Sequence, residues 1–167
     1  ISQSIDDQVF KVGVFVNTDV EIINSISLEV GLDMVQLSGD EVAEDYQGIA
    51  LPVIRTMHVD DQFDPSVMDS YPAHAVLLDS KVPGQYGGTG QTWSWDRVKL
   101  GQISKPLILS GGLNSDNVSD AIERTAPAAI DVSSGVEAAP GRKSPAKLRA
   151  LFKALANHEG TNEQPFK

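Results

Sequence analysis

Cysteine is absent from the 167-residue sequence, which excludes disulfide bonds and thiolate metal sites among these residues. Long apolar runs are also missing, since none approaches the roughly 20 residues that a membrane-spanning helix needs. The first seven residues are polar and acidic, unlike a secretory signal peptide. These absences predict a cytoplasmic protein without a membrane partner.

Positive charge is scarce as well. The chain has 13 Lys and Arg against 23 Asp and Glu, a net charge of −10. Contact with a nucleic-acid backbone needs a basic surface, so we expect no nucleic-acid partner. The three histidines, His58, His74 and His158, do not stand at metal-ligand spacing, and we expect no metal site.

The sequence does contain enough apolar residues, 41%, to build the core of one domain. Short apolar runs recur about 20–30 residues apart, the length of one strand–helix unit. The runs are continuous rather than alternating, which is typical of strands buried on both faces in a parallel sheet. The six runs are residues 12–16, 34–37, 51–54, 75–78, 106–109 and 129–132.

The segments between the runs are predicted to be helical. Apolar residues recur at helical spacing over residues 20–30, 115–124 and 145–156. Gly31 suits the end of the first helix, Asn114 the N-cap of the second, and Ser144 the start of the third. Six strand–helix units in a row indicate an α/β fold, either a doubly wound sheet or a (β/α) barrel.

Two strand ends carry residues suited to binding an anion. Gly111 and Gly112 follow the fifth run and precede a helix, where backbone N–H groups and the helix N-terminus favour negative charge. Ser133 and Ser134 follow the sixth run and add hydroxyl groups. Two consecutive strand ends of this kind resemble the phosphate site of barrels. The alternative is that the glycines only make tight turns.

Two polar residues interrupt apolar strands. Asp79 follows the fourth run, where a buried carboxyl group with a raised pKa could act as a general acid or simply cap a loop. Gln36 lies inside the second run, and its buried amide is either a substrate ligand or part of an internal network. Arg55 and His58, at the end of the third run, are interpreted as surface or rim residues.

The longest interval separates the fourth and fifth runs and holds Gly84, Gly87, Gly88 and Gly90. We predict a mobile loop there, over residues 80–91, that becomes ordered when a ligand binds.

Taken together, these motifs resemble the phosphoribosylanthranilate isomerase family of tryptophan biosynthesis, in family order and spacing from about residue 11 to residue 155. The resemblance rests on Lys11-Val-Gly-Val-Phe-Val-Asn17, Val35-Gln-Leu-Ser-Gly-Asp-Glu41, Leu77-Leu-Asp-Ser80, Tyr86-Gly-Gly-Thr-Gly90, Leu109-Ser-Gly-Gly-Leu113 and Asp131-Val-Ser-Ser-Gly-Val-Glu137.

The resemblance implies a (β/α)8 TIM barrel without metal or cofactor. It also implies an Amadori rearrangement of N-(5′-phosphoribosyl)anthranilate to 1-(2-carboxyphenylamino)-1-deoxyribulose 5-phosphate, so the expected partner is a phosphorylated small molecule. A general acid opens the furanose ring, and a base then removes the C2′ proton. By motif match, Asp79 is the acid and Gln36 and Asp131 contact the substrate. The same match assigns phosphate binding to Gly111, Gly112, Ser133 and Ser134.

Two departures from the family pattern shape these expectations. Ser38 stands where the family usually has His, and the Lys-x-Cys-Gly motif that carries the family's base has no counterpart. We therefore expect residues 1–156 to be a partial barrel, strands 3 to 8 of the family, followed by a polar tail over residues 157–167. N-terminal βα units or a fused biosynthetic domain are the expected partners, and the 167 residues alone are expected to lack turnover.

Two other functions fit part of the pattern. Indole-glycerol-phosphate synthase shares the phosphate site but needs a catalytic Lys at a strand end, and none of the six runs ends in Lys. A catalytically incomplete phosphate-binding fragment or assembly module would keep the anion site and lack the base.

Overall fold

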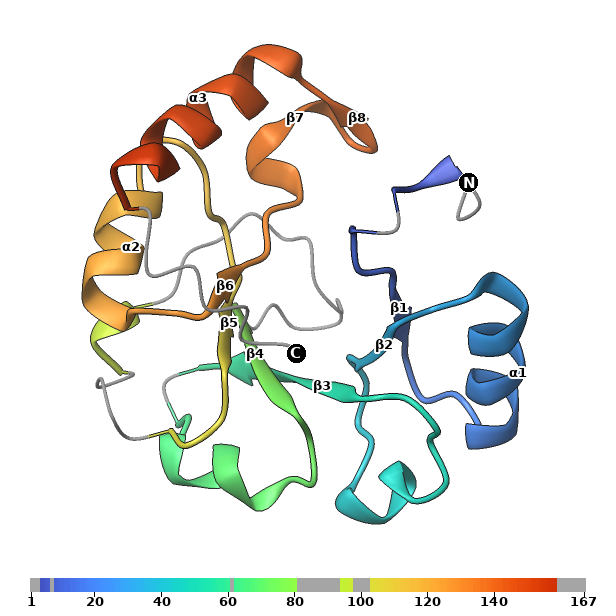
Figure 1. The fold of residues 1–167 in the computed structure, drawn as a ribbon. Coiled ribbons are helices and arrows are strands. Elements are labelled where there is room, and N and C mark those ends of the chain that lie inside the picture. The colour runs from blue at the N-terminus through green and yellow to red at the C-terminus, as the bar shows by residue number, and fades with distance from the viewer. Residues whose placement is uncertain (1–3, 7, 61, 81–93, 98–102, 159–167) are drawn as a thin grey trace.

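The computed structural model describes residues 4–158 except 7, 61, 81–93 and 98–102. Its main feature is a six-stranded parallel sheet in which each strand pairs with its neighbours in the sequence, so that the order is β1-β2-β3-β4-β5-β6. Figure 1 shows the strands along a curve, with the helices outside it. The strands are β1 (Val12–Phe15), β2 (Met34–Leu37), β3 (Val53–Val59), β4 (Ala75–Ser80), β5 (Leu107–Leu109) and β6 (Ala129–Ile130).

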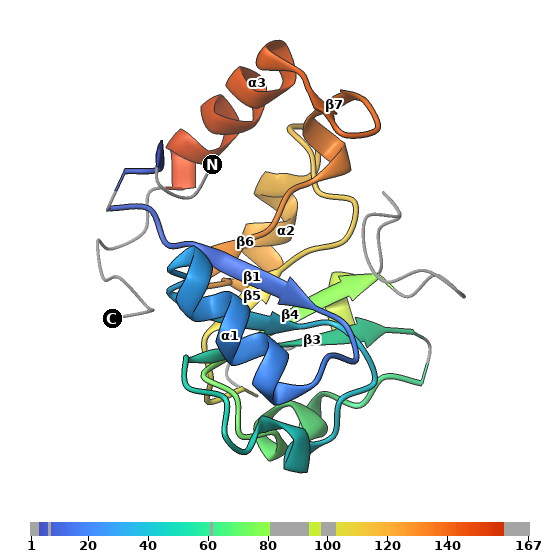
Figure 2. The ribbon, with the colours of Figure 1, turned by 90° about the vertical axis from the view of Figure 1, so that its right-hand side faces the viewer.

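The strands point the same way, so their carboxyl ends gather at one edge of the sheet (Figure 2). Three α-helices follow strands or loops on the outer face: α1 (Val20–Val30), α2 (Val118–Thr125) and α3 (Pro145–Leu155). Between β6 and α3 the chain forms the antiparallel hairpin of β7 (Glu137–Ala139) and β8 (Arg142–Lys143). The fold is thus of the α/β class with a partial barrel.

The inner face of the sheet changes from apolar to polar along the strands. Alternate residues of a strand face opposite sides of a sheet. In β3 the inner residues are Ile54, Thr56 and His58 in that order, and in β4 they include Leu77 and Asp79. The apolar half packs as a small inner core, whereas the polar half lies at the carboxyl ends. A cavity at those ends is therefore lined by polar groups on an apolar floor.

The outer face is mostly apolar, with Arg55 of β3 as a charged exception, and it packs under the helices and turns. Val35 and Leu37 of β2 join Ile23 of α1, and Val76 and Leu78 of β4 join other buried residues. Because both faces of these strands are covered, their sequence is continuously apolar. This is the reason the parallel sheet could be predicted from short runs.

The third strand is longer than predicted and begins later. The prediction was residues 51–54, but β3 spans Val53–Val59. Its polar residues did not end the strand, because Arg55 on the outer face and Thr56 and His58 on the inner face all have polar surroundings. The interpretation of Arg55 as a surface or rim residue is wrong, since only 8% of it is exposed.

The helices are fewer and shorter than the sequence predicted. After β2 and β3 the chain forms 3-10 helices, η2 (Ala43–Tyr46) and η3 (Pro65–Ser70), instead of α-helices. The second helix starts at Val118, not at residue 115. The side chain of Asn117 accepts a hydrogen bond from the backbone N–H of Asn114 at 2.8 Å, which shapes a turn ahead of the helix. Three further 3-10 helices are η4 (Trp95–Arg97), η5 (Ser134–Val136) and η6 (Ala156–His158).

Helix ends follow the predictions at two of three places. Gly31 ends α1 in the left-handed conformation, with φ at 68°. Ser144 caps α3 by accepting a hydrogen bond from the N–H of Lys147. The expected tail after residue 156 begins as η6, and residues 159–167 lie outside the described part.

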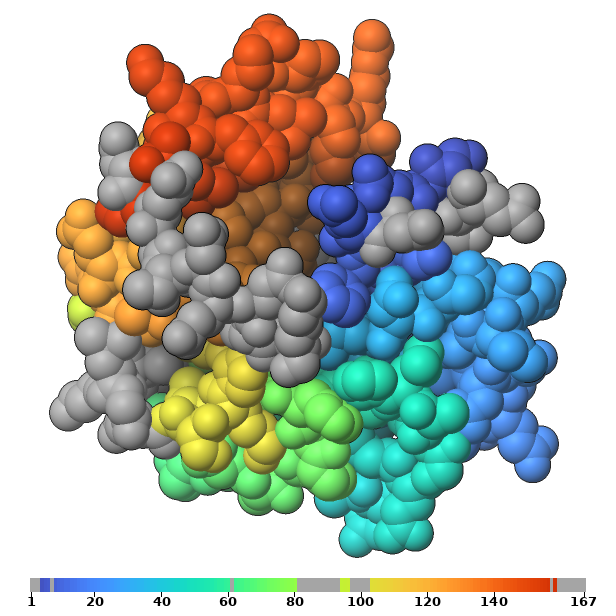
Figure 3. All heavy atoms as spheres, viewed as in Figure 1, coloured from blue at the N-terminus to red at the C-terminus, as the bar shows by residue number. Residues whose placement is uncertain are grey.

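The first strand is an edge of the sheet and keeps apolar side chains exposed. Val14 is 61% exposed on the inner side. In the space-filling view the surface is recessed between the start of the chain, in blue, and the orange residues of the region from β6 to α3 (Figure 3). Across the described residues, no helix is long and apolar enough to cross a membrane.

Candidate active site

A cavity of about 340 Å³ opens at the carboxyl ends of the strands. It takes residues from all six strands or the loops that follow them, which explains why its parts are far apart in the sequence. The lining residues are Val14, Val16, Gln36, Ser38, Thr56, His58, Leu77, Asp79, Ser110, Gly111, Gly112, Leu113, Asp131, Ser133, Ser134 and Gly135. Every site residue predicted from the sequence is among them.

Asp79 is the most deeply buried carboxyl group of this cavity, with 6% of the residue exposed. Burial raises the pKa of Asp79 above its usual value, and the nearby charge of Asp131 acts in the same direction. The N–H of Ser80, which donates to Asp79 Oδ1 at 2.8 Å, and the neighbouring His58 oppose this rise. The net effect favours a protonated carboxyl, which can donate a proton.

Gly111 and Gly112 form the loop after β5, with φ angles of 93° and 65° that favour glycine. The carbonyl of Gly112 accepts hydrogen bonds from the side-chain amides of Asn114 at 3.3 Å and Asn117 at 3.0 Å. In a trans peptide the next N–H, that of Leu113, points away from this carbonyl. The asparagines thus fix the orientation of the glycine loop beside the cavity.

The loop after β6 packs directly against the glycine loop. A Cβ atom added to Gly135 would fall on the backbone carbonyl oxygen of Leu113, and it would lie 3.2 Å from Cβ of Asn114. Ser133 and Ser134 precede this contact and line the same cavity. Their loop is held from outside by Lys143, whose Nζ donates to the carbonyl of Ser133 at 2.9 Å. The two predicted anion-binding segments therefore form one continuous wall.

Asp131 adds a second carboxyl group to this region of the cavity. Its Oδ2 accepts a hydrogen bond from Ser110 Oγ at 3.2 Å. Ser110 is the residue just before the glycine loop, so Asp131 connects the end of β6 to the start of the predicted anion-binding wall.

Gln36 belongs to an internal network, which is one of the two alternatives that the sequence left open, and it also lines the cavity. Its Nε2 donates to Ser38 Oγ and to Thr56 Oγ1, each at 3.1 Å, and the two hydroxyl oxygens lie 2.9 Å apart. All three residues also line the cavity. Ser38 is thus tied into an internal network that presents neutral polar groups to the cavity.

Sequence reasoning assigned no role in the site to several cavity residues, among them the polar residues Thr56 and His58. His58 is the register partner of Asp79 on the adjacent strand and is half-buried, so the interpretation as a rim residue misplaced it. The signal was present as alternation, because Ile54, Thr56 and His58 are every second residue of one strand. The glycine-rich loop predicted after β4 lies outside the described residues.

A metal site is not formed by the part of the chain that the structure describes, where no three His, Asp or Glu side chains are grouped to hold an ion. The arrangement in the cavity instead combines a buried carboxyl group, a second carboxyl group and the wall formed by the two loops that the sequence predicts to bind an anion. A family model described as N-(5'phosphoribosyl)anthranilate (PRA) isomerase matches residues 2–154. The chain belongs to this isomerase family.

Relatives within the isomerase family are similar over most of the chain. The N-(5'-phosphoribosyl)anthranilate isomerase of Syntrophus aciditrophicus is 43% identical over 157 residues, which is 93% of this chain and 68% of that protein. The isomerase of Pseudomonas fluorescens is 44% identical over 146 residues, 86% of this chain and 71% of that protein.

Solved structures of the isomerase family share this fold. The crystal structure of phosphoribosyl anthranilate isomerase from Thermus thermophilus superposes with a TM-score of 0.84 at 35% identity, covering 94% of this chain and 77% of that one. A family member in complex with reduced 1-(o-carboxyphenylamino)-1-deoxyribulose 5-phosphate gives a TM-score of 0.76 at 34% identity, covering 93% and 76%. The sequence resemblance to this isomerase family is confirmed.

Proposed function

We propose that this protein acts in the isomerisation of N-(5′-phosphoribosyl)anthranilate to 1-(2-carboxyphenylamino)-1-deoxyribulose 5-phosphate. The observation that carries the proposal is that a buried carboxyl group, Asp79, shares one cavity with two loops suited to a phosphate. Membership of the isomerase family supports the same reaction. The substrate would be a phosphorylated small molecule.

The phosphate is proposed to bind against the wall formed by Gly111, Gly112, Ser133 and Ser134. Glycines let an anion approach the backbone closely, and the serines offer hydroxyl donors. The two loops are held together by the close contact of Gly135 with Leu113, so their donors form a preorganised set. This arrangement would anchor one end of the substrate and leave its sugar near the centre of the cavity.

Asp79 is proposed as the general acid. In its protonated form it would donate its proton to the furanose ring oxygen as the C1′–O bond breaks, which opens the ring and leaves Asp79 as a carboxylate. Gln36 and Asp131 are proposed to contact the sugar. The proton at C2′ must then go to a base, which the family pattern assigns to a motif with no counterpart in these 167 residues.

The complete architecture is proposed to be the (β/α)8 barrel that the resemblance implies, with β1 to β6 as its strands 3 to 8. Residues 1–156 would belong to this barrel domain. The cytoplasmic location stays a prediction.

Binding and turnover test the proposal separately. Reduced 1-(o-carboxyphenylamino)-1-deoxyribulose 5-phosphate, the compound bound in the family complex described above, serves as the product analogue. This analogue should bind the wild-type chain and compete with inorganic phosphate. Turnover is followed on freshly generated phosphoribosylanthranilate, with product separated by chromatography, and Asp79→Asn is the matched control. Absence of analogue binding would contradict the proposed function. Binding without turnover would show that the base is not among these residues, whereas equal turnover of both proteins would remove Asp79 from the mechanism.

A further inference from the structure

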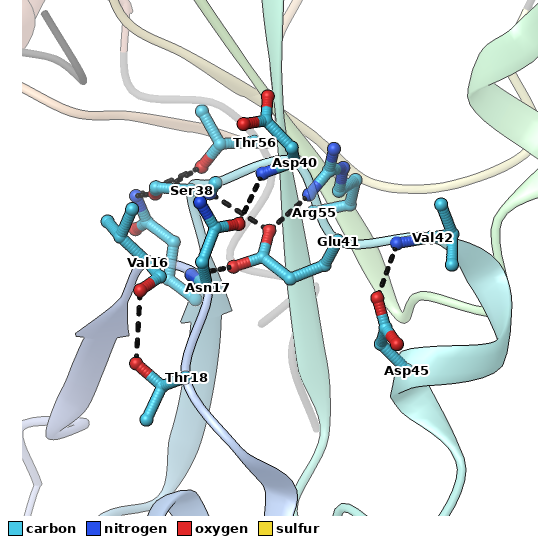
Figure 4. Close-up of polar contacts among 12 residues, drawn as sticks. Val16, Asn17, Thr18, Ser38, Asp40, Glu41, Val42, Asp45, Arg55 and Thr56 are labelled. Atoms are coloured by element: carbon cyan, nitrogen blue, oxygen red, sulfur yellow. Dashed lines mark hydrogen bonds and ion pairs between the residues drawn. The ribbon is translucent and has the colours of Figure 1, made fainter.

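A buried carboxylate, Glu41, joins the carboxyl ends of β1 and β2 to the middle of β3 (Figure 4). Only 6% of Glu41 is exposed. Its Oε1 accepts the backbone N–H of Asn17 at 2.8 Å, and its Oε2 accepts the backbone N–H of Gly39 at 2.9 Å. Arg55 Nη1 donates to the same Oε2 at 2.7 Å. One side chain thus connects the loop after β1, the loop after β2 and the middle of β3.

Arg55 is held on its other side as well. Its guanidinium carbon lies 5.1 Å from the centre of the Tyr71 ring, within the range of a cation–π contact. The side chains of the ion pair are 10% exposed for Arg55 and 5% for Glu41. The pair is therefore shielded from solvent.

The loops after β1 and β2 also contact each other directly beside this carboxylate. Asn17 adopts a positive φ of 49°, and its Oδ1 accepts the N–H of Asp40 at 2.8 Å. A Cβ on Gly39 would lie 2.8 Å from the backbone nitrogen of Asn17. A side chain at position 39 would therefore clash with Asn17, and Gly39 lies between Asn17 and the carboxylate of Glu41 that accepts its N–H.

Two residues bound by Glu41 are next in sequence to residues that line the cavity. Gly39 follows Ser38, and Arg55 precedes Thr56. Because adjacent residues of a strand face opposite sides, Arg55 points to the buried outer network while Thr56 points into the cavity. Fixing Gly39 and Arg55 thus fixes the 2.9 Å contact between the two hydroxyls.

We propose that Glu41, with Arg55 as its counter-ion, is a positioning residue that holds Gln36, Ser38 and Thr56 in the geometry that contacts the non-phosphate part of the substrate. A buried ion pair is weak grounds for stability, because desolvation offsets most of its attraction. Its role here is to define geometry. The identity of the ligand in this proposal rests on the proposed function. The positioning role of Glu41 rests only on its hydrogen bonds and its ion pair with Arg55.

The first test compares two ligands, inorganic phosphate and the reduced product analogue. The proposed anion-binding wall is formed by the loops after β5 and β6, whereas the Glu41 network lies at β1, β2 and β3. In Glu41→Gln and Arg55→Met the analogue affinity should fall roughly tenfold or more, because small misplacements of contacting groups are costly. Phosphate affinity should not change. A general loss of structure would weaken both ligands, so equal losses would overturn the proposal.

Two further variants serve as controls. Arg55→Lys keeps a positive charge and a donor for Glu41, and it should retain most of the analogue affinity. Asp120→Asn removes an exposed ion pair with Arg124 on α2 and should change neither ligand's binding. If Arg55→Lys loses as much analogue affinity as Arg55→Met, the positive charge of residue 55 is not what holds Gln36, Ser38 and Thr56 in place.

The second test needs no ligand. The side-chain amide protons of Gln36 are measured by NMR and assigned by their loss in Gln36→Met. In Glu41→Gln and Arg55→Met their exchange with water should accelerate by roughly tenfold, because their acceptors lose a fixed position. Unchanged exchange in a folded variant would overturn the proposal. A wild-type chain that fails to bind the analogue would refute the proposed function, and the exchange rates would still decide the role of Glu41.

Discussion

Gly135→Ala should separate the two loops of the anion-binding wall. The added methyl group would fall on the carbonyl oxygen of Leu113 and lie 2.9 Å from its carbonyl carbon, and both are backbone atoms that cannot rotate away. The loops must then move apart by on the order of 1 Å, a displacement that can cost about 10²-fold in a positioned site. We expect the affinity for phosphate and for the product analogue to fall by that order. Overpacking should also lower the free energy of unfolding by about 1–3 kcal/mol.

Gly31→Ala is the matched control for the loss of a glycine. Gly31 has a φ of 68° and no atom within 4 Å of the added Cβ, so its cost comes from the backbone conformation alone. That cost is about 1–2 kcal/mol, close to the expected destabilisation of Gly135→Ala. The two variants should therefore unfold at similar urea concentrations but differ in ligand binding.

Isothermal titration calorimetry measures the affinity of Gly135→Ala and Gly31→Ala for phosphate and for the product analogue. The experiment is done at a temperature where circular dichroism shows both variants folded. If Gly135→Ala binds phosphate as tightly as Gly31→Ala does, the contact between the loops does not shape the anion site, and the assignment of the wall to these two loops is wrong.

Three further outcomes follow from the cavity. Asp79→Asn should lower kcat about 10²–10⁴-fold, with little change in analogue affinity, because it removes a proton donor of the same size; near-normal turnover would refute this. The pKa of Asp79 is raised by folding, so the folded state holds its proton to higher pH and the wild type should lose stability relative to Asp79→Asn as pH rises above about 4. Urea midpoints of both proteins at pH 4 and pH 7 check the sign. A wild-type midpoint that stays constant or rises relative to that of Asp79→Asn between these pH values would contradict the prediction. Gly112→Val should abolish phosphate binding, because Gly112 has a φ of 65° and lines the cavity, and unchanged affinity in a titration would place the anion elsewhere.

Most site residues that could be predicted from the sequence stand at or shortly after the end of an apolar run, and Gln36, inside the second run, is an exception. Asp79, Gly111 and Ser133 were found this way, because parallel strands bring their carboxyl ends to one edge. Residues within a strand gave a weaker signal. His58 was misplaced because a strand of seven residues was taken to be four.

Local sequence determined where most strands lie, where α1 and α3 begin or end, and which loops can approach an anion. These features depend on burial of both strand faces, on the positive φ of Gly31 and on the cap of Ser144, which act within a few residues. The tertiary structure alone decided the rest. Glu41 and Arg55 are 14 residues apart and form an ion pair only because β2 and β3 are neighbours in register. A buried charge is stable only beside its partner, so Arg55 can lie buried within β3 because of a contact that no local pattern encodes.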